Sequence, residues 1–592
     1  MEMAGQWENL PEECWELVFD RLGHNRHLEA PSLVCKRFLS ISNRLRSSLT
    51  VSDPTVLLHG GISGLLRRFH KLKRIDLVEF HGDSDRLLRE VAFSGLNLEV
   101  LNLSKQRRFP VEGVKELGAK VKTLRILICS GLCFLQDGDL VAIADSFSSL
   151  EELDISHPQQ DFGSLAELDY ADDCAVSGSF PGTVSDAGIA LLSSKLQRLR
   201  KINISGNHFV SDRSLLSLSS KCVFLREIVA RDCSLISEIG IALAIRHNPH
   251  LISLAVHGSK ISSAAAAVSS SFTIESSLIC ARALCTLDFS QMIISDDLLS
   301  SIIQADLPLH RLGLSRCRGF TFAGISSLLC KYSSLNYLDI EGTAFLTDQS
   351  MLELSHYLHD VNFINLNSSS NLTNSTFFLL VQTCPHLEEI RMERTSLGKE
   401  GSPADLKNSK IHTLKLSWNK CLTNETLKGI AMVCPNLRSL DISHCWSITG
   451  EGIGYIGMNC CNIKMLEVNG CSGTSNLGTC FGFSKLEVLH AAGSRIDDEG
   501  LRIMGQSSRW LQHLVLEGCL GVTAKGLKEV VTNCKGLKEV RLKKCCNVGS
   551  DVIAWMVFSR PSLRKLIPPG DIVSTERQRE FFLRHGCWVQ DH

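Results

Sequence analysis

Apolar residues recur along most of the chain in the pattern L-x-x-L-x-L, most often at intervals of 26 residues. The clearest copy is "CPNLRSLDISHCWSITGEGIGYI", residues 434–456. The alternation around L-x-L is that of a short strand with one buried side, and a Ser, Thr or Asp then precedes a stretch with helical spacing. The pattern therefore predicts strand–helix units, whose first apolar positions are 72, 98, 124, 150, 199, 225, 251, 284, 309, 335, 361, 387, 411, 437, 463, 486, 511, 537 and 563.

This unit resembles the leucine-rich repeat. The resemblance implies an α/β fold in which parallel strands line the concave side of a curved solenoid and helices line the convex side. About 18 units would occupy residues 51–562. Residues 563–592 would form a C-terminal cap, in which "TERQREFFLRHG" makes a closing helix.

One column of positions tests the repeat. Three residues after the last apolar residue of L-x-L, thirteen of the fourteen copies from 199 to 537 carry a small side chain that can form hydrogen bonds: Asn207, Cys233, Ser259, Cys317, Thr343, Ser369, Thr395, Asn419, Cys445, Cys471, Ser494, Cys519 and Cys545, with Met292 as the exception. The chain turns inward there, so buried backbone groups need partners that this column can supply. The first four copies depart from it, with Phe80, Gln106, Leu132 and Pro158.

The cysteines fit the same repeat. A second column, three residues before the first apolar position, holds Cys222, Cys384, Cys434, Cys460 and Cys534. Together the two columns account for eleven of the 24 cysteines as core residues. Two steps between copies are long, 49 residues from 150 and 33 from 251, and the first contains an acidic insertion, residues 158–182. We expect a surface loop there, and its role stays open.

The segment "WENLPEECWELVFDRLG", residues 7–23, predicts a helix that Asn9 caps and Gly23 ends. It carries two apolar stripes, one made of Leu10, Cys14, Leu17 and Val18 and the other of Trp15, Phe19 and Leu22. Residues 24–50 predict two more short helices. Three such helices can bury only one of the stripes, so the other needs a partner or the first repeat.

The stretch "LPEECWELVFDRL" followed by "SLVCKRF" resembles the F-box, which gives a helical domain at residues 1–50. With the repeats behind it, the chain resembles an F-box/leucine-rich-repeat protein of a plant-like type. The resemblance implies that the F-box binds the SKP adaptor of an SCF ubiquitin ligase, and through it the cullin and RING subunits. The repeats would hold a protein substrate for ubiquitination and proteasomal degradation. The adaptor contacts that follow by motif are Leu10, Pro11, Leu17, Val18, Leu22, Val34, Cys35 and Lys36, with Phe38 internal.

A substrate surface is expected at the outward position of L-x-L and the positions after it. Most of these residues are Ser, Asn, Gly or Asp, but three adjacent copies carry Arg391, Glu393, Arg394, Lys415, Trp418, Asp441 and His444. Arg and Trp are favoured as interface anchors, although a plain charged surface is the alternative. A second candidate is the basic end with Arg541, Lys543 and Lys544.

Composition narrows the function further. Lys and Arg number 62 against 63 for Asp and Glu, so no net charge recruits nucleic acid or an anionic membrane. No signal segment or membrane-length apolar run is evident, so we expect a protein of the cytoplasm or nucleus with reduced cysteines. No C-x-x-C pair, phosphate-binding loop or catalytic constellation is evident. We therefore expect no metal, no cofactor and no catalytic residue, and a receptor that acts by proximity rather than an enzyme.

Two other function classes stay open. One is a small-molecule hormone co-receptor, such as the plant auxin and jasmonate receptors, which would need basic side chains at the outward position of L-x-L to bind an anionic ligand. In this chain those positions hold acids and neutral residues, except for Arg391, Lys415 and Arg541. A repeat scaffold that works outside any ligase is the other class, and failure to co-purify with the adaptor would favour it.

Overall fold

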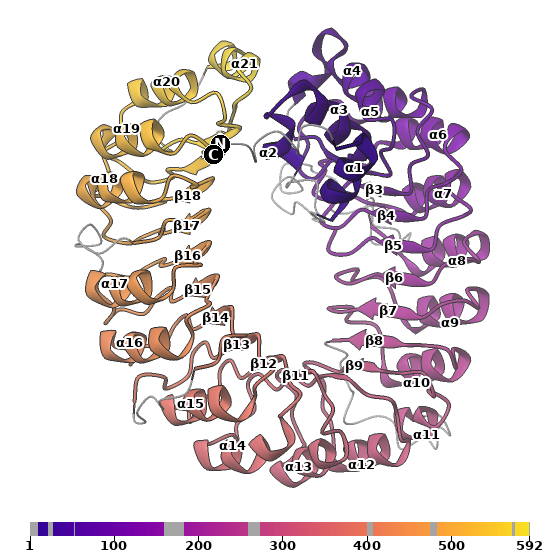
Figure 1. Ribbon diagram of the computed structural model, residues 1–592. Coiled ribbons are helices and arrows are strands. Elements are labelled where there is room, and N and C mark those ends of the chain that lie inside the picture. The colour runs from indigo at the N-terminus through magenta and orange to yellow at the C-terminus, as the bar shows by residue number, and fades with distance from the viewer. Residues whose placement is uncertain are drawn as a thin grey trace, which may run out of the picture. The chain divides into compact units, whose positions relative to one another are not determined.

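The computed structural model describes residues 10–21, 28–52, 54–158, 183–257, 273–399, 407–473, 482–570 and 575–590. The chain forms two compact units, residues 1–283 and 284–592. In both, short parallel strands alternate with helices (Figure 1). This is the arrangement of a leucine-rich-repeat solenoid, as the spacing predicts.

The strands of the first unit are β1 (Ser48–Thr50), β2 (Arg74–Asp76), β3 (Val100–Asn102), β4 (Ile126–Ile128), β5 (Glu152–Asp154), β6 (Lys201–Asn203), β7 (Glu227–Ala230) and β8 (Ser253–Val256). Those of the second are β9 (Thr286–Asp288), β10 (Arg311–Gly313), β11 (Tyr337–Asp339), β12 (Phe363–Asn365), β13 (Glu389–Arg391), β14 (Thr413–Lys415), β15 (Ser439–Asp441), β16 (Met465–Glu467), β17 (Val488–His490), β18 (His513–Val515), β19 (Glu539–Arg541), β20 (Lys565–Ile567) and β21 (Trp588–Val589).

The helices of the first unit are α1 (Glu12–Asp20), α2 (Glu29–Ser32), α3 (Lys36–Leu45), α4 (Gly61–Arg68), α5 (Ser84–Ala92), α6 (Val111–Lys120), α7 (Asp137–Ser146), α8 (Asp186–Lys195), α9 (Asp212–Lys221), α10 (Glu238–His247) and α11 (Ile274–Leu278). Those of the second are α12 (Asp296–Gln304), α13 (Phe322–Lys331), α14 (Asp348–Leu354), α15 (Asn374–Thr383), α16 (Asn424–Val433), α17 (Gly450–Asn459), α18 (Asp498–Ser507), α19 (Ala524–Asn533), α20 (Ser550–Ser559) and α21 (Glu576–Arg584).

Each predicted copy begins two residues before a strand, from β2 after position 72 to β20 after position 563. Within each unit, neighbouring strands pair in parallel with their central residues aligned, as Leu414 is with Leu440. These central side chains are buried, and the helices lie on one side of the strands (Figure 1). The repeat pattern does not predict β1 or β21, which pair with β2 and β20. The predicted closing helix is α21, and the domain boundaries at 50 and 562 stay predictions.

A chain of hydrogen bonds links the amino ends of successive helices. Asp186 accepts from the backbone N–H and the hydroxyl of Ser211 at 2.8 and 2.6 Å, and Asp498 does the same with Thr523 at 2.8 and 2.5 Å. Although burial opposes it, hydrogen bonds from Ser211 and Ser214 hold the pKa of Asp186 below its ordinary value. The caps Ser211 and Thr523 are thereby each fixed by the repeat before them.

The predicted column of small polar residues supplies partners to buried carbonyls. The thiol of Cys445 donates to the carbonyl of Leu416 at 3.3 Å, and the amide of Asn419 donates to that of Met392 at 2.7 Å. Burial raises the pKa of Cys445 to about 12, so it remains a thiol that can donate. Gln106, expected to depart from the column, donates to the Leu77 carbonyl. Gln106 departs from the column in size, but its longer amide reaches the equivalent carbonyl. Ser259 lies outside the described residues.

The start of the first helix differs from the prediction. Helix α1 begins at Glu12, its N-cap is Pro11, and it ends before Arg21, so caps at Asn9 and Gly23 were wrong. The residue before a proline disfavours helical dihedral angles, which prevents the helix from starting at Leu10. The acidic insertion lies between β5 and α8, and apart from Pro158 it falls outside the described residues.

Candidate functional site

Helix α1 packs one of its two apolar stripes against α3. The ring of Trp15 lies 4.7 Å from that of Phe38, and Phe19 meets Phe38 edge to face at 5.1 Å. These rings surround a small core that includes the buried Leu28 and Ile41. Phe38 is half-buried and packs against this core.

The other stripe of α1 faces away from this core. Leu17 and Val18 are 68% and 49% exposed, and Val34, between α2 and α3, is 69% exposed. Leu33, which is not among the contacts predicted from the motif, is another exposed apolar side chain, at 87%. We call Leu17, Val18, Leu33 and Val34 the apolar N-terminal surface.

The other predicted adaptor contacts differ in how exposed they are. Pro11, Cys35 and Lys36 are exposed, Leu10 is half-buried, and Leu22 lies outside the described residues. The Cys35 sulfur also accepts the backbone N–H of Phe38 at 3.4 Å and so caps α3. Cys35 therefore has a structural role that the motif did not reveal.

Ion pairs fasten α1 to α3. The Arg44 guanidinium reaches Glu12 at 2.5 Å and Glu16 at 2.9 Å. The hydrogen bond from Arg44 holds the pKa of Glu12 below its ordinary value. These pairs and the aromatic core hold α1 in one orientation, which keeps Leu17 and Val18 on its outer side.

The second candidate site lies on β13 to β15, on the side of the strands that carries no helix. Arg391, Lys415 and Asp441 stand at the same register position of these three strands. The Lys415 ammonium lies 2.6 Å from Glu467 and 3.6 Å from Asp441. Burial opposes the charge of Lys415, but these carboxylates raise its pKa. Hydrogen bonds from His490 and Lys415 lower the pKa of Glu467 to about 2. Lys415 is thus part of a fixed charge network.

Three further predicted residues form a stack just beyond these strands. Arg394, Trp418 and His444 all have positive φ, at 53, 62 and 58°. The Trp418 and His444 rings stack with centroids 4.0 Å apart and an angle of 17° between their planes. The Arg394 guanidinium lies 5.5 Å from the Trp418 ring, which remains 38% exposed. A Cβ at Gly470 would come within 2.4 Å of the His444 ring, so glycine there leaves room for it. We call these three residues the Arg–Trp–His stack.

Glu393 completes the predicted set but is half-buried. Burial raises its pKa, although a hydrogen bond with Ser417 opposes the shift. The structure therefore brings the predicted substrate residues together on neighbouring repeats. It also uses most of them in contacts with each other, which makes this surface stiff.

Sequence reasoning missed an aromatic pair beside Arg391. Tyr337 and Phe363 stack face to face with centroids 4.2 Å apart, and the guanidiniums of Arg311 and Arg391 lie 4.1 and 5.0 Å from the Tyr337 and Phe363 rings. Arg311, Tyr337 and Phe363 occupy the first outward position of the repeat, two residues after its start. The substrate surface expected from the sequence includes only the second outward position and those after it, although the repeat spacing also places Tyr337 and Phe363 at matching positions. Tyr337 and Phe363 extend the candidate surface from β15 back to β11.

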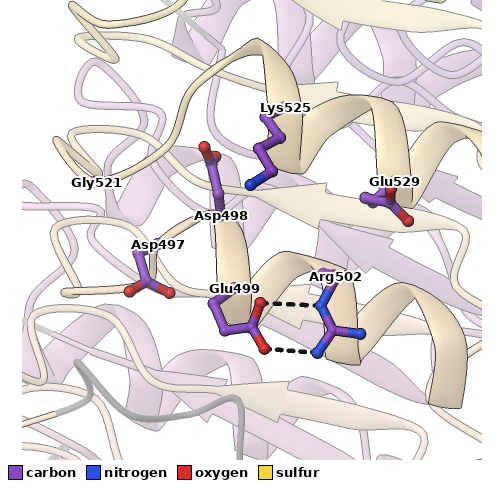
Figure 2. Close-up of a pocket in the computed structure, with 7 residues that line it drawn as sticks. All are labelled: Asp497, Asp498, Glu499, Arg502, Gly521, Lys525 and Glu529. Atoms are coloured by element: carbon purple, nitrogen blue, oxygen red, sulfur yellow. Dashed lines mark hydrogen bonds and ion pairs between the residues drawn. The ribbon is translucent and has the colours of Figure 1, made fainter.

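The other predicted basic surface is partly neutralised. Arg541 pairs with Glu539 at 2.7 Å, whereas Lys543 and Lys544 are exposed. A cavity of about 330 Å³ lies between the start of α18 and that of α19 (Figure 2). Three of the four acids that line it have partners, because Asp497 and Asp498 accept hydrogen bonds at helix starts and Glu499 pairs with Arg502 at 2.5 Å. We therefore assign this cavity to the architecture of the repeat.

Comparison with known proteins matches residues 433–457 to the family described as leucine-rich repeat. Among solved structures, the yeast Rad7 and Elc1 complex is 16% identical with a TM-score of 0.43, covering 82% of this chain and 93% of that one. A complex of TLR13 with ssRNA13 is 12% identical with a TM-score of 0.39, covering 86% and 69%. None of the helices in the described residues is long and apolar enough to cross a bilayer. The matched segment contains β15 and most of α17, so this copy of the predicted unit matches a leucine-rich repeat.

Proposed function

We propose that this chain is the substrate-recognition subunit of an SCF-type ubiquitin ligase. The observation that carries the proposal is the division of α1 into two sides. Trp15 and Phe19 pack into the small helical core, while Leu17 and Val18 stay exposed, as does Val34. An apolar surface of this kind on a helical unit is typical of a docking site for another protein. Its position within the segment that resembles an F-box supports the SKP adaptor as that partner.

The repeats would then hold the substrate. The strip from Tyr337 and Phe363 through Arg391 to the Arg–Trp–His stack combines aromatic and guanidinium groups, which are favoured in interface hot spots. Because internal contacts already order these side chains, a protein substrate would pay little conformational entropy to bind them. We propose this strip as the substrate surface.

The chain would act by proximity. The adaptor would connect it to the cullin and RING subunits, and the bound substrate would be held near the charged ubiquitin-conjugating enzyme. Such tethering raises the effective concentration of a substrate lysine without a nucleophile or base from the receptor. In this proposal the chain itself is not an enzyme and needs no cofactor. It would work in the cytoplasm or nucleus, where its cysteines would stay reduced.

Reconstitution tests the proposal. The full-length chain is mixed with purified SKP adaptor, cullin and RING subunits and separated by size-exclusion chromatography. We expect one complex that contains all four proteins, formed only when the adaptor is present. A chain that elutes alone at micromolar concentrations of every component would contradict the ligase role and favour a scaffold that works elsewhere.

A further inference from the structure

Two histidines and an aspartate meet on neighbouring turns of the second unit. His359 and Asp360 lie in the turn before β12, and His386 lies in the turn before β13. One side-chain ligand atom from each lies within 4.8 Å of the other two. His359 Nδ1 is 3.1 Å from an Asp360 carboxylate oxygen, and the two imidazole rings lie 5.7 Å apart, edge to face.

The backbone beneath these side chains is held firmly. Leu358, Val361 and Leu387, which flank the three residues, are fully buried. The N–H of Glu388 donates to the carbonyl of Asn362 at 2.8 Å, directly before the paired strands β12 and β13. The three polar side chains are exposed, so they can rotate while their backbone positions stay fixed.

We propose that His359, Asp360 and His386 bind a borderline divalent transition-metal ion, with Zn²⁺ as the cellular ligand. Imidazole nitrogens and a carboxylate oxygen suit this class of ion, and three protein ligands leave one tetrahedral position open. Zinc bonds of about 2.0–2.2 Å require donor atoms about 3.3 Å apart. Closing from the observed separation needs only side-chain rotation. Water or a side chain of a partner would fill the fourth position.

Lys410 modulates this site. Its ammonium lies 2.9 Å from Nδ1 of His386, where it can donate a hydrogen bond. That contact leaves Nε2 of His386 as the metal ligand. A positive charge so close also opposes a cation, so Lys410 lowers the affinity of the site. The ligands are two histidines and an aspartate from two different repeats, so no local motif of closely spaced cysteines marks the site.

The test uses full-length protein freed of metal by a chelator and titrated with Zn²⁺ by calorimetry and with Co²⁺ by visible absorption. Cobalt separates the classes of ligand, because binding to the cysteines adds a thiolate charge-transfer band. We expect one site with a tetrahedral cobalt spectrum that lacks this band. His386→Ala should weaken binding about 10- to 100-fold and Asp360→Asn about 10-fold, whereas Lys410→Gln should tighten it about threefold.

His310→Ala is the matched control, because His310 is an exposed histidine of another repeat. It should leave the affinity unchanged. The altered side chains are exposed, so the metal-free variants should melt with the wild type. Equal affinity of wild type and His386→Ala, or cobalt binding that carries only the thiolate band, would overturn the proposal.

Discussion

The indole of Trp418 lies almost parallel to the imidazole of His444, with 4.0 Å between ring centroids. The two residues belong to successive repeats and share a positive φ, which directs both side chains along the same line. With Arg394 over the indole, one aromatic ring connects three repeats. The candidate substrate surface is therefore ordered before any partner binds.

Truncation of Trp418 or Arg394 should weaken substrate binding. Trp418→Ala or Arg394→Ala should cost about 2 kcal/mol of substrate affinity, or about 30-fold, because both would act as interface anchors. The measurement is affinity purification with the proteasome inhibited, followed by quantitative mass spectrometry of the bound proteins. Trp510→Ala is the control, since Trp510 is an exposed tryptophan away from the stack. Equal substrate recovery from all variants would mean that the Arg–Trp–His stack does not bind the substrate.

The core of the repeat should tolerate truncation poorly. Leu440 is fully buried at the centre of β15, so Leu440→Ala should lower the free energy of unfolding by about 2–5 kcal/mol. Leu352→Ala, at an exposed leucine of α14, should change it by less than about 0.5 kcal/mol. Chemical denaturation of both variants measures the difference. Equal stabilities would mean that the repeat core has been misassigned.

The column of small polar residues should matter as much as the apolar core. Asn419 is fully buried, donates to two carbonyls and accepts the N–H of Thr395 at 2.9 Å. Asn419→Ala leaves these groups without partners and should cost about 1–3 kcal/mol of unfolding free energy. Asn436→Ala, at an exposed asparagine in the next turn, should cost much less. A neutral Asn419→Ala would show that the column fills space only.

Asp339 gives a prediction with a definite pH dependence. Burial raises its pKa from 3.8 to about 6, with Glu341 and Asp288 adding to the shift. Because the folded state disfavours the carboxylate, stability should rise as the pH falls from above 6 to below 3.8. Asp339→Asn should therefore stabilise the protein at pH 7.5, by about 1–3 kcal/mol, and the difference from wild type should vanish near pH 4. Melting across this range checks it, and a constant difference would contradict the assignment.

The strands were predictable because each copy of L-x-x-L-x-L buries its central apolar residue in the same register. Leu440 and Leu414 are typical cases. Strands β1 and β21 lie outside that pattern and take their conformation from pairing with β2 and β20. Gln106 is larger than the other polar residues of the column, and its hydrogen bond to the Leu77 carbonyl could not be predicted from residue type.

The candidate sites were predictable only in part. The two stripes of α1 follow from helical spacing, but that spacing does not decide which stripe is buried, so the exposure of Leu17 and the burial of Phe19 come from the structure. The stacking of Trp418 on His444 depends on backbone dihedral angles that no local motif specifies. Tyr337 and Phe363 are 26 residues apart, and only their shared register reveals the contact.

We propose that the apolar N-terminal surface binds the SKP adaptor. The most direct measurement is calorimetric titration of purified adaptor into the full-length chain and into the Leu17→Ala, Val34→Ala double variant, with thermal melting of each protein. We predict that the double variant binds about 30- to 1,000-fold more weakly, a loss of about 2–4 kcal/mol. Its melting should be unchanged, because both side chains are exposed. Met458→Ala, at an exposed methionine of α17, should bind as the wild type does. Undiminished adaptor binding by the double variant would contradict this proposal. A loss of both adaptor binding and melting temperature would instead mean that the N-terminal helices chiefly shield the first repeat.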